Sequence, residues 1–282
     1  MQLTNNYTLP EPLVSAIKND SYDKVGDRSA TALIKPVQIY ELEKRHDTEI
    51  IVDAADLLHL LMGKSIHNVL EKADTSNHLA EERMFIDVLG WKISAKPDLL
   101  DSNGILSDYK YTSVWAFILG NKPEWEAQLN IYRLVFEDHG FPVNKLQIVA
   151  ILDGWSRRQA KLDPAYPQKK SLTVEIPMWP TAKTRAYLEE RVRLHQLAEN
   201  LPDNKLPECS PAERWARPTT YAVKKEENKK AFRVFENPET AAQLATEKGM
   251  IVEVRPGENV RCDDFCLVRQ WCNQVRVEAI TH

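Results

Sequence analysis

Apolar residues recur along this chain with two periods, one typical of β-strands and the other of amphipathic helices. Alternation over residues 84–91 (MFIDVLGW), and over the runs on both sides of Asn103-Gly104, predicts three short antiparallel strands. The Asn-Gly pair predicts a two-residue hairpin turn in which both residues take positive φ. Residues 145–153 (KLQIVAILD) form a continuous apolar run typical of a buried strand, and residues 171–177 (SLTVEIP) alternate like an edge strand.

Helical periodicity is clearest over residues 53–73, where Asp53 is a suitable N-cap. The apolar positions of this segment are Leu57, Leu60, Leu61, Ile66, Val69 and Leu70. A second helix is predicted over residues 122–138, with Pro123 in its first turn. Further helices are predicted over residues 13–17, 37–45, 180–200 and 240–248, and a hairpin over residues 221–235. Strands and helices arranged in this way predict an α/β fold with a central mixed sheet.

Composition and charge limit the classes of protein that need to be considered. The 282 residues, 43% of them hydrophobic, suffice for one sizeable core with or without an appended unit. A net charge of −4 provides no general basic field, which argues against a protein that coats DNA passively. No apolar run approaches the ~18 residues that span a bilayer, and the first residues lack a signal-peptide pattern. We therefore expect a cytoplasmic protein with reduced cysteines.

The candidate chemistry is concentrated around the predicted hairpin. Asp108 and Lys110 are two residues apart in a predicted strand, so their side chains share one face of the sheet. Asp98 ends the neighbouring strand and can reach that face. Two carboxylates can bind Mg²⁺ or Mn²⁺, and a lysine beside them can stabilise a phosphoryl group under attack. Each of these residues alone is ordinarily a solvent-facing charge, so only the combination indicates phosphodiester hydrolysis.

Two predicted helices add polar residues that could join this site. His67 lies beside the apolar face of the helix over residues 53–73, and imidazole is a good ligand for Mn²⁺. Gln128 and Tyr132 are four residues apart in the helix over residues 122–138, so they share a face. The alternative is that His67 is an ordinary core or surface histidine and that the other helix is simply amphipathic.

A family resemblance rests on the order of these residues. Four short motifs follow one another along the chain: Gly63-x-x-x-His67, Pro97-Asp98, Asp108-x-Lys110 and Gln128-x-x-x-Tyr132. Together they resemble the signature of the PD-(D/E)XK nuclease superfamily, and in particular its RecB-like exonuclease group. That group includes the AddB nuclease domain, CRISPR-associated RecB-like exonucleases and many phage proteins. The resemblance covers about residues 63–132 and implies a restriction-endonuclease-like core, with a central mixed sheet flanked by helices.

The resemblance implies a role for each residue of the metal site. His67, Asp98 and Asp108 would hold Mg²⁺ or Mn²⁺, and the backbone carbonyl of Tyr109 is a further possible ligand. Lys110 would position the attacking water. We therefore expect these five residues to meet in one pocket.

Contacts to DNA are expected from other residues. The resemblance implies that Gln128 and Tyr132 touch DNA near the scissile phosphate, and it places Glu82 as an accessory acid. Arg157 and Arg158 lie in the most basic loop of the chain, which also contains tryptophan, a combination that suits single-stranded DNA. For Glu82 and for both arginines, a solvated surface charge is the alternative interpretation.

All four cysteines lie in the last third of the chain: Cys209, Cys262, Cys266 and Cys272. The last three form a C-x3-C-x5-C pattern. Four thiolates suit either a tetrahedral zinc ion or an iron–sulfur cluster. The pattern resembles the [4Fe–4S] arrangement of AddB and CRISPR-associated relatives, which favours the cluster over Zn²⁺. This chain departs from those families because their lone cysteine precedes the catalytic core, whereas Cys209 follows it.

These observations predict three segments: an N-terminal helical arm over residues 1–52, a nuclease core over 53–203 and a cysteine-stapled lobe over 204–282. The predicted function is that of a metal-dependent DNA exonuclease in recombination, repair or phage DNA processing, in the cytoplasm of a bacterial or phage-infected cell. A structure-selective endonuclease and a catalytically idle DNA-binding module are the alternatives. The chain lacks a G-x-x-x-x-G-K-[ST] loop, so a helicase or recombination partner would be a separate protein. Oligomeric state and polarity of digestion are left open.

Overall fold

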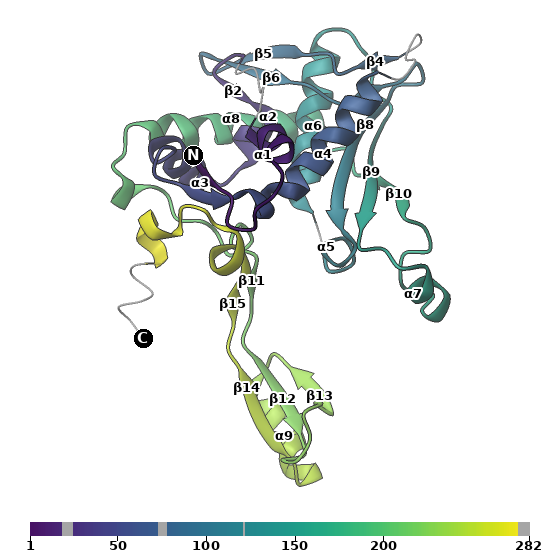
Figure 1. Cartoon of the computed structure of the whole chain (residues 1–282), viewed down its shortest axis with the longest axis vertical. Coiled ribbons are helices and arrows are strands. Elements are labelled where there is room, and N and C mark those ends of the chain that lie inside the picture. Colours follow the sequence, from purple (N-terminus) through teal and green to yellow (C-terminus); the bar gives the residue numbers. More distant parts are fainter. Residues whose placement is uncertain (19–24, 73–77, 121, 276–282) are drawn as a thin grey trace. The chain divides into compact units, whose positions relative to one another are not determined.

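The computed structural model describes residues 1–18, 25–72, 78–120 and 122–275, and the chain divides into two compact units (Figure 1). The first unit comprises Met1–Lys35 and His46–Asn200, and the second comprises Pro36–Arg45 and Leu201–His282. The division into three segments drawn from the sequence stays a prediction, because compact packing alone does not show which segments fold on their own.

A five-stranded mixed sheet forms the centre of the first unit, in the order β10-β9-β8-β7-β4. Strands β8 (Ile105–Ser113) and β9 (Lys145–Asp153) run parallel, and β10 (Ser171–Ile176) adds antiparallel at the edge. On the other side, β7 (Leu99–Leu100) and β4 (Leu79–Ala80) continue the sheet antiparallel. The predicted α/β class, the β9 strand and the β10 edge strand are confirmed.

Residues 84–91 do not form the single strand that their alternation predicted. They split into β5 (Met84–Val88) and the start of β6 (Trp91–Ala95), which pair with each other. Strand β6 also pairs with β2 (Arg28–Ser29), which completes a second sheet. The two-residue turn between them has positive φ at both Leu89 (50°) and Gly90 (82°). This is the tight primed geometry that the sequence had placed at Asn103-Gly104.

The hairpin at Asn103-Gly104 exists, but its turn differs from the prediction. Gly104 has φ of +75°, whereas Asn103 is not among the residues with positive φ. The amide of Gly104 donates to the carbonyl of Asp101 at 3.0 Å, and the Asp101 carboxylate accepts from the amides of Asn103 (2.9 Å) and Ile105 (2.8 Å). The aspartate therefore stabilises a three-residue loop in which only the glycine needs the left-handed region.

Three long helices complete the first unit. Helix α6 (Pro123–Asp138) packs most deeply, since every residue from 127 to 136 is buried. Helix α8 (Thr181–Glu199) covers α6, and α4 (Leu58–Glu71), which follows the short turn η1 (Ala54–Leu57) capped by Asp53, lies against β8. The remaining elements are β1 (Gln2–Thr4), α1 (Glu11–Lys18), α2 (Ala30–Ile34), β3 (Ile51–Asp53), α5 (Val114–Ile118) and α7 (Arg157–Leu162).

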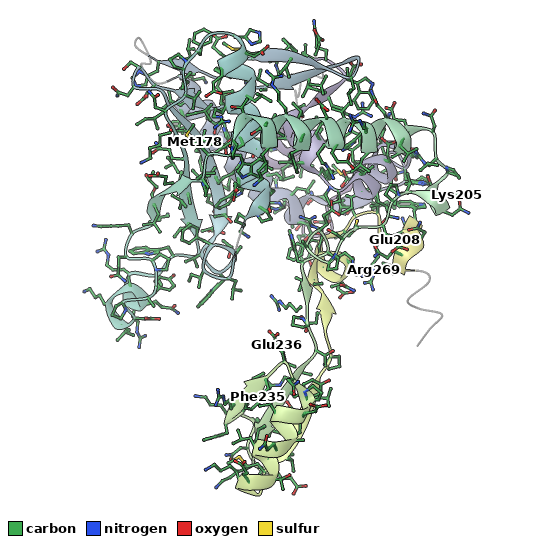
Figure 2. The ribbon with its side chains drawn as sticks, turned by 180° about the vertical axis from the view of Figure 1, so that it is seen from behind. Met178, Lys205, Glu208, Phe235, Glu236 and Arg269 are labelled. Atoms are coloured by element: carbon green, nitrogen blue, oxygen red, sulfur yellow. The ribbon has the colours of Figure 1, made fainter. Side chains whose placement is uncertain are left out.

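The second unit is built from helix α3 (Val37–Arg45) and the C-terminal chain. The segment between Cys209 and Cys262 forms the ribbon β11 (Ala216–Arg217) with β15 (Glu258–Asn259), and a small sheet of β12 (Thr220–Lys224), β13 (Arg233–Phe235) and β14 (Ile251–Arg255). Helix α9 (Pro238–Lys248) packs on this sheet. Phe235, labelled in Figure 2, lies at the end of the edge strand β13. The short turns η2 (Asp203–Lys205), η3 (Arg261–Phe265) and η4 (Arg269–Trp271) complete the unit. The predicted hairpin and the helix after it are confirmed.

Across the described part of the chain, every helix is too short or too polar to cross a membrane.

Candidate functional site

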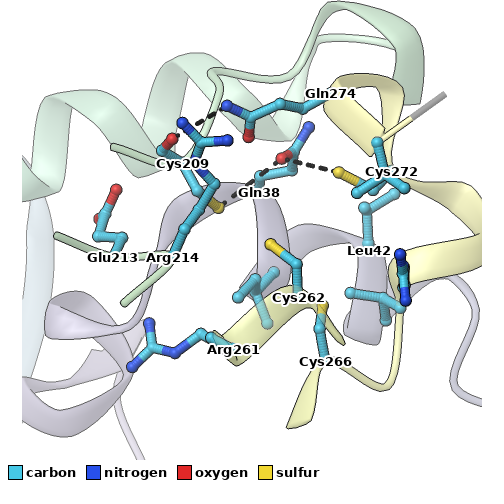
Figure 3. Close-up of a pocket in the computed structure, with 14 residues that line it drawn as sticks. Gln38, Leu42, Cys209, Glu213, Arg214, Arg261, Cys262, Cys266, Cys272 and Gln274 are labelled. Atoms are coloured by element: carbon cyan, nitrogen blue, oxygen red, sulfur yellow. Dashed lines mark hydrogen bonds between the residues drawn. The ribbon is translucent and has the colours of Figure 1, made fainter. Parts of the chain in front are cut away.

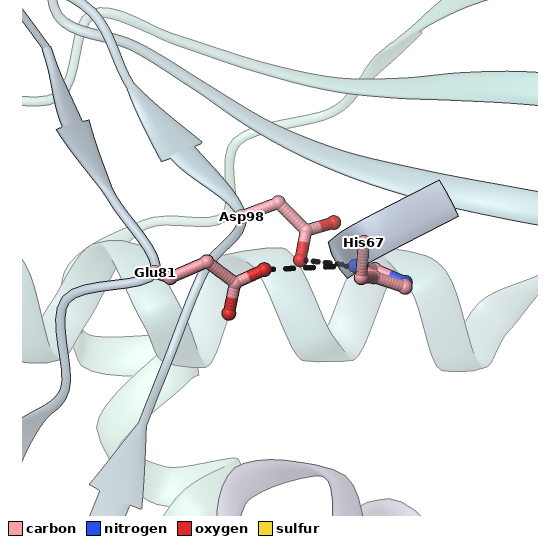
Figure 4. Close-up of side chains that lie close together, drawn as sticks. All are labelled: His67, Glu81 and Asp98. Carbon is pink, nitrogen blue, oxygen red and sulfur yellow. Dashed lines mark ion pairs between the residues drawn. The ribbon is translucent and has the colours of Figure 1, made fainter. Parts of the chain in front are cut away.

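Three residues from separate elements meet at the centre of the candidate site (Figure 4). The Nδ1 atom of His67, on α4, lies 3.0 Å from Oδ1 of Asp98, just before β7, and 3.7 Å from Oε1 of Glu81, just after β4. One ligand atom from each of the three lies within 4.8 Å of the others. An imidazole and two carboxylates are therefore gathered at one point.

A second group of side chains surrounds Asp108 on β8. Its Oδ2 atom lies 2.6 Å from Nζ of Lys110, and Nε2 of Gln128 donates to Oδ1 at 2.9 Å. The same Gln128 nitrogen also donates to the hydroxyl of Tyr132 at 2.9 Å. Helix α6 thus orients the Asp108 carboxylate from behind, while Lys110 faces it along the strand.

Asp98 connects these two groups. Its Oδ2 atom accepts from the backbone amide of Tyr109 at 2.5 Å, and its carbonyl accepts from the amide of Glu81 at 3.2 Å. Glu81 has a left-handed φ of 55°, an uncommon conformation for a residue with a side chain. Lys96 holds the other side of the Glu81 carboxylate, with Nζ 2.5 Å from Oε2.

Burial and neighbouring charges shift the pKa values of the residues in this site. Hydrogen bonds to Asp98 and Glu81 raise the pKa of His67 to about 10, against the opposing effect of burial. Burial raises the pKa of Asp108 to about 6, although the Lys110 charge opposes the shift. Burial acts to raise the pKa of Glu81, but its bonds to His67 and Lys96 outweigh this and lower it. The protonated imidazole thus balances the carboxylates around it.

The donor set fits a divalent cation. Mg²⁺ and Mn²⁺ accept carboxylate oxygens, and imidazole nitrogen suits Mn²⁺. The trio that the structure brings together is His67, Asp98 and Glu81. Of the Asp108 carboxylate, Oδ1 accepts from Gln128, and Oδ2 is ion-paired with Lys110 but is buried without a hydrogen bond. A histidine ligand must be neutral, so a cation would take the place of the His67 proton.

Glu82, the predicted accessory acid, is exposed, and its neighbour Glu81 occupies the site instead. Two adjacent glutamates before a strand look alike in sequence; in the structure Glu81 has a φ of 55° and its carboxylate faces His67.

The residues predicted to contact DNA fall into two classes. Gln128 and Tyr132 are each only 4% exposed, so in this structure they support Asp108 rather than present a surface to a strand. Arg157 and Arg158 are exposed at the start of α7.

The four cysteines line one small pocket of the second unit (Figure 3). The thiols of Cys209 and Cys272 both donate to Oε1 of Gln38 on α3, at 3.7 and 3.4 Å. Cys262 and Cys266, on and just after η3, complete the group. None of the four forms a disulfide.

The surroundings of these thiols suit a bound metal centre. Burial raises the pKa of Cys209 to about 12, so a metal would be needed to hold the thiolate there. Arg214 and Arg261 line the same pocket, and their charges can balance anionic sulfur. Gln274 donates from Nε2 to the carbonyl of Cys209 at 3.2 Å and fixes that loop.

The spacing of the sulfur atoms bears on which metal they fit. A tetrahedral zinc ion, with Zn–S bonds of about 2.3 Å, places its sulfurs about 3.8 Å apart. Among the described residues, no three cysteine sulfurs lie within 4.8 Å of one another. The four thiols are therefore not gathered to the spacing of a tetrahedral zinc site in this structure.

Comparisons with known proteins do not identify a family. No family model matches the sequence, and no curated protein matches it. The crystal structure of SSO0001 is 19% identical with a TM-score of 0.45, over 65% of this chain and 85% of the other. A candidate exonuclease from Eubacterium rectale is 13% identical with a TM-score of 0.27, over 71% of this chain and 84% of the other. At these identities and TM-scores, the likenesses show no activity for this chain.

Proposed function

We propose that this protein is a divalent-metal-dependent DNA nuclease, with exonuclease action on single-stranded or end-bearing DNA as its main mode. The observation that carries the proposal is the convergence of His67, Glu81 and Asp98 within 4.8 Å. Beside them lies the Asp108–Lys110 pair, with nitrogen and oxygen 2.6 Å apart. Cation-binding carboxylates next to a lysine are the groups that phosphodiester hydrolysis needs.

Each side chain has a task that follows from its position. His67, Glu81 and Asp98 would hold Mg²⁺ or Mn²⁺, which when bound supplies Lewis acidity toward the phosphate. Lys110 is half-buried and can orient a water molecule or stabilise the charge that develops on the phosphate. Gln128 fixes the Asp108 carboxylate so that Lys110 keeps its direction.

The exonuclease mode is favoured because the order of the four motifs resembles RecB-like exonucleases. A structure-selective endonuclease could use the same groups. A catalytically idle DNA-binding module is disfavoured, because Asp98, Asp108 and Lys110 are all present and paired. Asp98 lies 3.0 Å from His67, and Asp108 lies 2.6 Å from Lys110. We place the activity in recombination, repair or phage DNA processing, with any helicase as a separate partner.

The proposal can be tested with the full-length protein, Mn²⁺, and end-labelled linear and circular single-stranded DNA. We expect the linear form to be shortened from its end and the circle to remain intact. Lys110→Ala should lower the cleavage rate at least 100-fold, because Lys110 is the only lysine among the described residues that pairs with Asp108. Lys145→Ala is the matched control, since Lys145 lies on the adjacent strand and pairs with Glu175 away from the site.

Cutting of both DNA forms would replace the exonuclease by an endonuclease on the same residues. Intact DNA in every reaction would leave only the binding module. Equal activity of the Lys110→Ala and Lys145→Ala variants would remove Lys110 from the mechanism.

We also propose that Cys209, Cys262, Cys266 and Cys272 bind a [4Fe–4S] cluster, with Zn²⁺ as the alternative. The C-x3-C-x5-C pattern, together with the position of Cys209 in the same pocket as the other three, supports the cluster. Anaerobically purified protein should be brown and contain about four iron atoms per chain. It should absorb light at roughly 400 nm, because of thiolate-to-iron charge transfer. Cys209→Ser should lower the iron content, whereas Ser210→Ala, at the exposed neighbouring residue, should not. A colourless sample with one zinc per chain would favour the alternative.

A further inference from the structure

Helix α5 (Val114–Ile118) exposes large apolar side chains directly beyond the strand that carries Asp108 and Lys110. Trp115 is 54% exposed, and Leu119 just after the helix is 72% exposed. Val114 is buried and anchors the helix, and the hydroxyl of Ser113 accepts from the amide of Trp115. Helix α5 is therefore anchored by Val114, while the indole ring of Trp115 faces outward.

Helix α7 (Arg157–Leu162) starts at the same end of the sheet (Figure 1). Strands β8 and β9 run parallel with Ser113 opposite Asp153, so the chain leaves both strands side by side. The ring of Trp115 lies edge-on to that of Tyr166, which follows α7, with ring centroids 6.2 Å apart. The exposed tryptophan and the basic helix thus belong to one surface.

This surface is positively charged. Arg157, Arg158 and Lys161 are exposed, and among the described residues none of the three has an ion-pair partner. Two acids lie nearby, Asp153 at the end of β9 and Asp163 just after α7, and among the described residues neither forms an ion pair with these three cations. The cations therefore remain available for an anionic ligand.

The surface also lies close to the candidate active site. Lys110 and Ser113 are three residues apart on β8, a distance of about 10 Å at the usual rise of a strand. That distance corresponds to roughly three stacked nucleotides. A strand whose scissile phosphate lies at Lys110 can therefore reach Trp115 within a few nucleotides.

We propose that α5 and α7 form a platform for single-stranded DNA, in which Trp115 stacks on a base and Arg157, Arg158 and Lys161 contact phosphates. The inference rests on the proposed nuclease function and specifies its substrate. An exposed indole beside unpaired cations suits single strands, because stacking requires a base free of its partner. Continuity with Lys110 and the positive charge favour a nucleic acid over an apolar protein partner.

The test measures binding separately from cleavage. The full-length protein in EDTA is titrated into 5′-fluorescein-labelled dT20, and fluorescence anisotropy gives the dissociation constant. Trp115→Ala should weaken binding about 5- to 150-fold, the loss of one stacked base, and Trp115→Phe should restore most of the affinity. A duplex of the same length should bind more weakly and be insensitive to Trp115→Ala. Thermal unfolding of each variant checks that the loss is not one of folding.

Substitution of the basic residues gives an independent measurement. Arg157→Gln together with Arg158→Gln should weaken dT20 binding and reduce the salt slope of log affinity by about 1.4, or about 0.7 for each lost phosphate contact. The control is Arg185→Gln with Arg193→Gln on α8, where both arginines are exposed but pair with acids. The control should keep the affinity and the slope of the unsubstituted protein.

The outcomes separate this inference from the proposed activity. Unchanged dT20 affinity in a folded Trp115→Ala protein would overturn the platform, even if the unsubstituted protein cleaves DNA. Weaker binding without any cleavage by the unsubstituted protein would support the platform and contradict the nuclease. A Trp115→Ala change in oligomeric state, with unchanged DNA binding, would assign the surface to a protein partner and overturn the proposal.

Discussion

Glu81 has a backbone conformation that residues with side chains seldom adopt, and this conformation directs its carboxylate to His67. The left-handed φ of 55° is stabilised by the bond from its amide to the Asp98 carbonyl. Lys96 neutralises part of its charge. Uncommon backbone conformations of this kind occur often at functional sites, where surrounding contacts stabilise them.

Neutralising Glu81 and Glu82 one at a time tests which of these two glutamates is a ligand of the cation. Glu81→Gln should weaken Mn²⁺ binding at least tenfold, because it replaces a carboxylate of the trio by a weaker neutral ligand. Glu82→Gln is the matched control and should leave the affinity unchanged, since Glu82 is exposed. Isothermal titration with MnCl₂ measures both. Equal losses, or a loss only in Glu82→Gln, would contradict the assigned ligand set.

At the scale of elements, two glycines differ in whether a larger side chain would fit at their positions. Gly63 lies within α4, and a Cβ added there would meet no atom within 4 Å. Gly104 closes the β7–β8 hairpin with φ of +75°, and a Cβ there would lie 2.7 Å from Nδ2 of Asn144. A methyl group therefore fits the helix but not the turn.

The same substitution at these two glycines should change stability in opposite directions. Gly63→Ala should raise the free energy of unfolding by about 0.5–1 kcal/mol, because alanine restricts the unfolded chain and favours helix. Gly104→Ala should lower it by at least about 1 kcal/mol through left-handed strain. Urea denaturation followed by circular dichroism measures both changes. Destabilisation by Gly63→Ala would show that α4 packs more tightly than the structure indicates.

At the scale of the whole molecule, the buried His195 makes the first unit sensitive to acid. Its side chain on α8 is fully buried, and Nε2 lies 3.2 Å from the carbonyl of Leu33. Burial lowers the pKa of His195 to about 4, and the charges of Arg191 and Arg28 add to this effect. The folded protein therefore resists protonation at a position that an unfolded chain protonates near its ordinary pKa of about 6.5.

The sign of the pH effect follows from this difference. Above about pH 6.5 His195 is neutral in both states and its contribution to stability is complete. As the pH falls from 6.5 toward 4, only the unfolded state gains the proton, and stability declines by on the order of 3 kcal/mol. Urea denaturation at several pH values should show this decline, and His195→Gln should flatten it. An equal decline in His195→Gln would assign the acid sensitivity to other groups.

Local physics determined much of the architecture directly from the sequence. The bounds of α6 and β9 follow from Pro123 and from an uninterrupted apolar run, because periodicity and terminal residues act over a few neighbours. The spacing of Asp108 and Lys110 likewise sufficed to place both on one face of a strand.

Only the tertiary structure decided which side chains complete the candidate site and which surface adjoins it. The choice of Glu81 over Glu82, the burial of Gln128 and Tyr132, and the exposure of Trp115 all depend on how distant segments pack. Periodicity along the chain carries no information about such contacts between remote residues. For the same reason the alternating run over residues 84–91 became two strands, since its central turn is decided by pairing across the sheet.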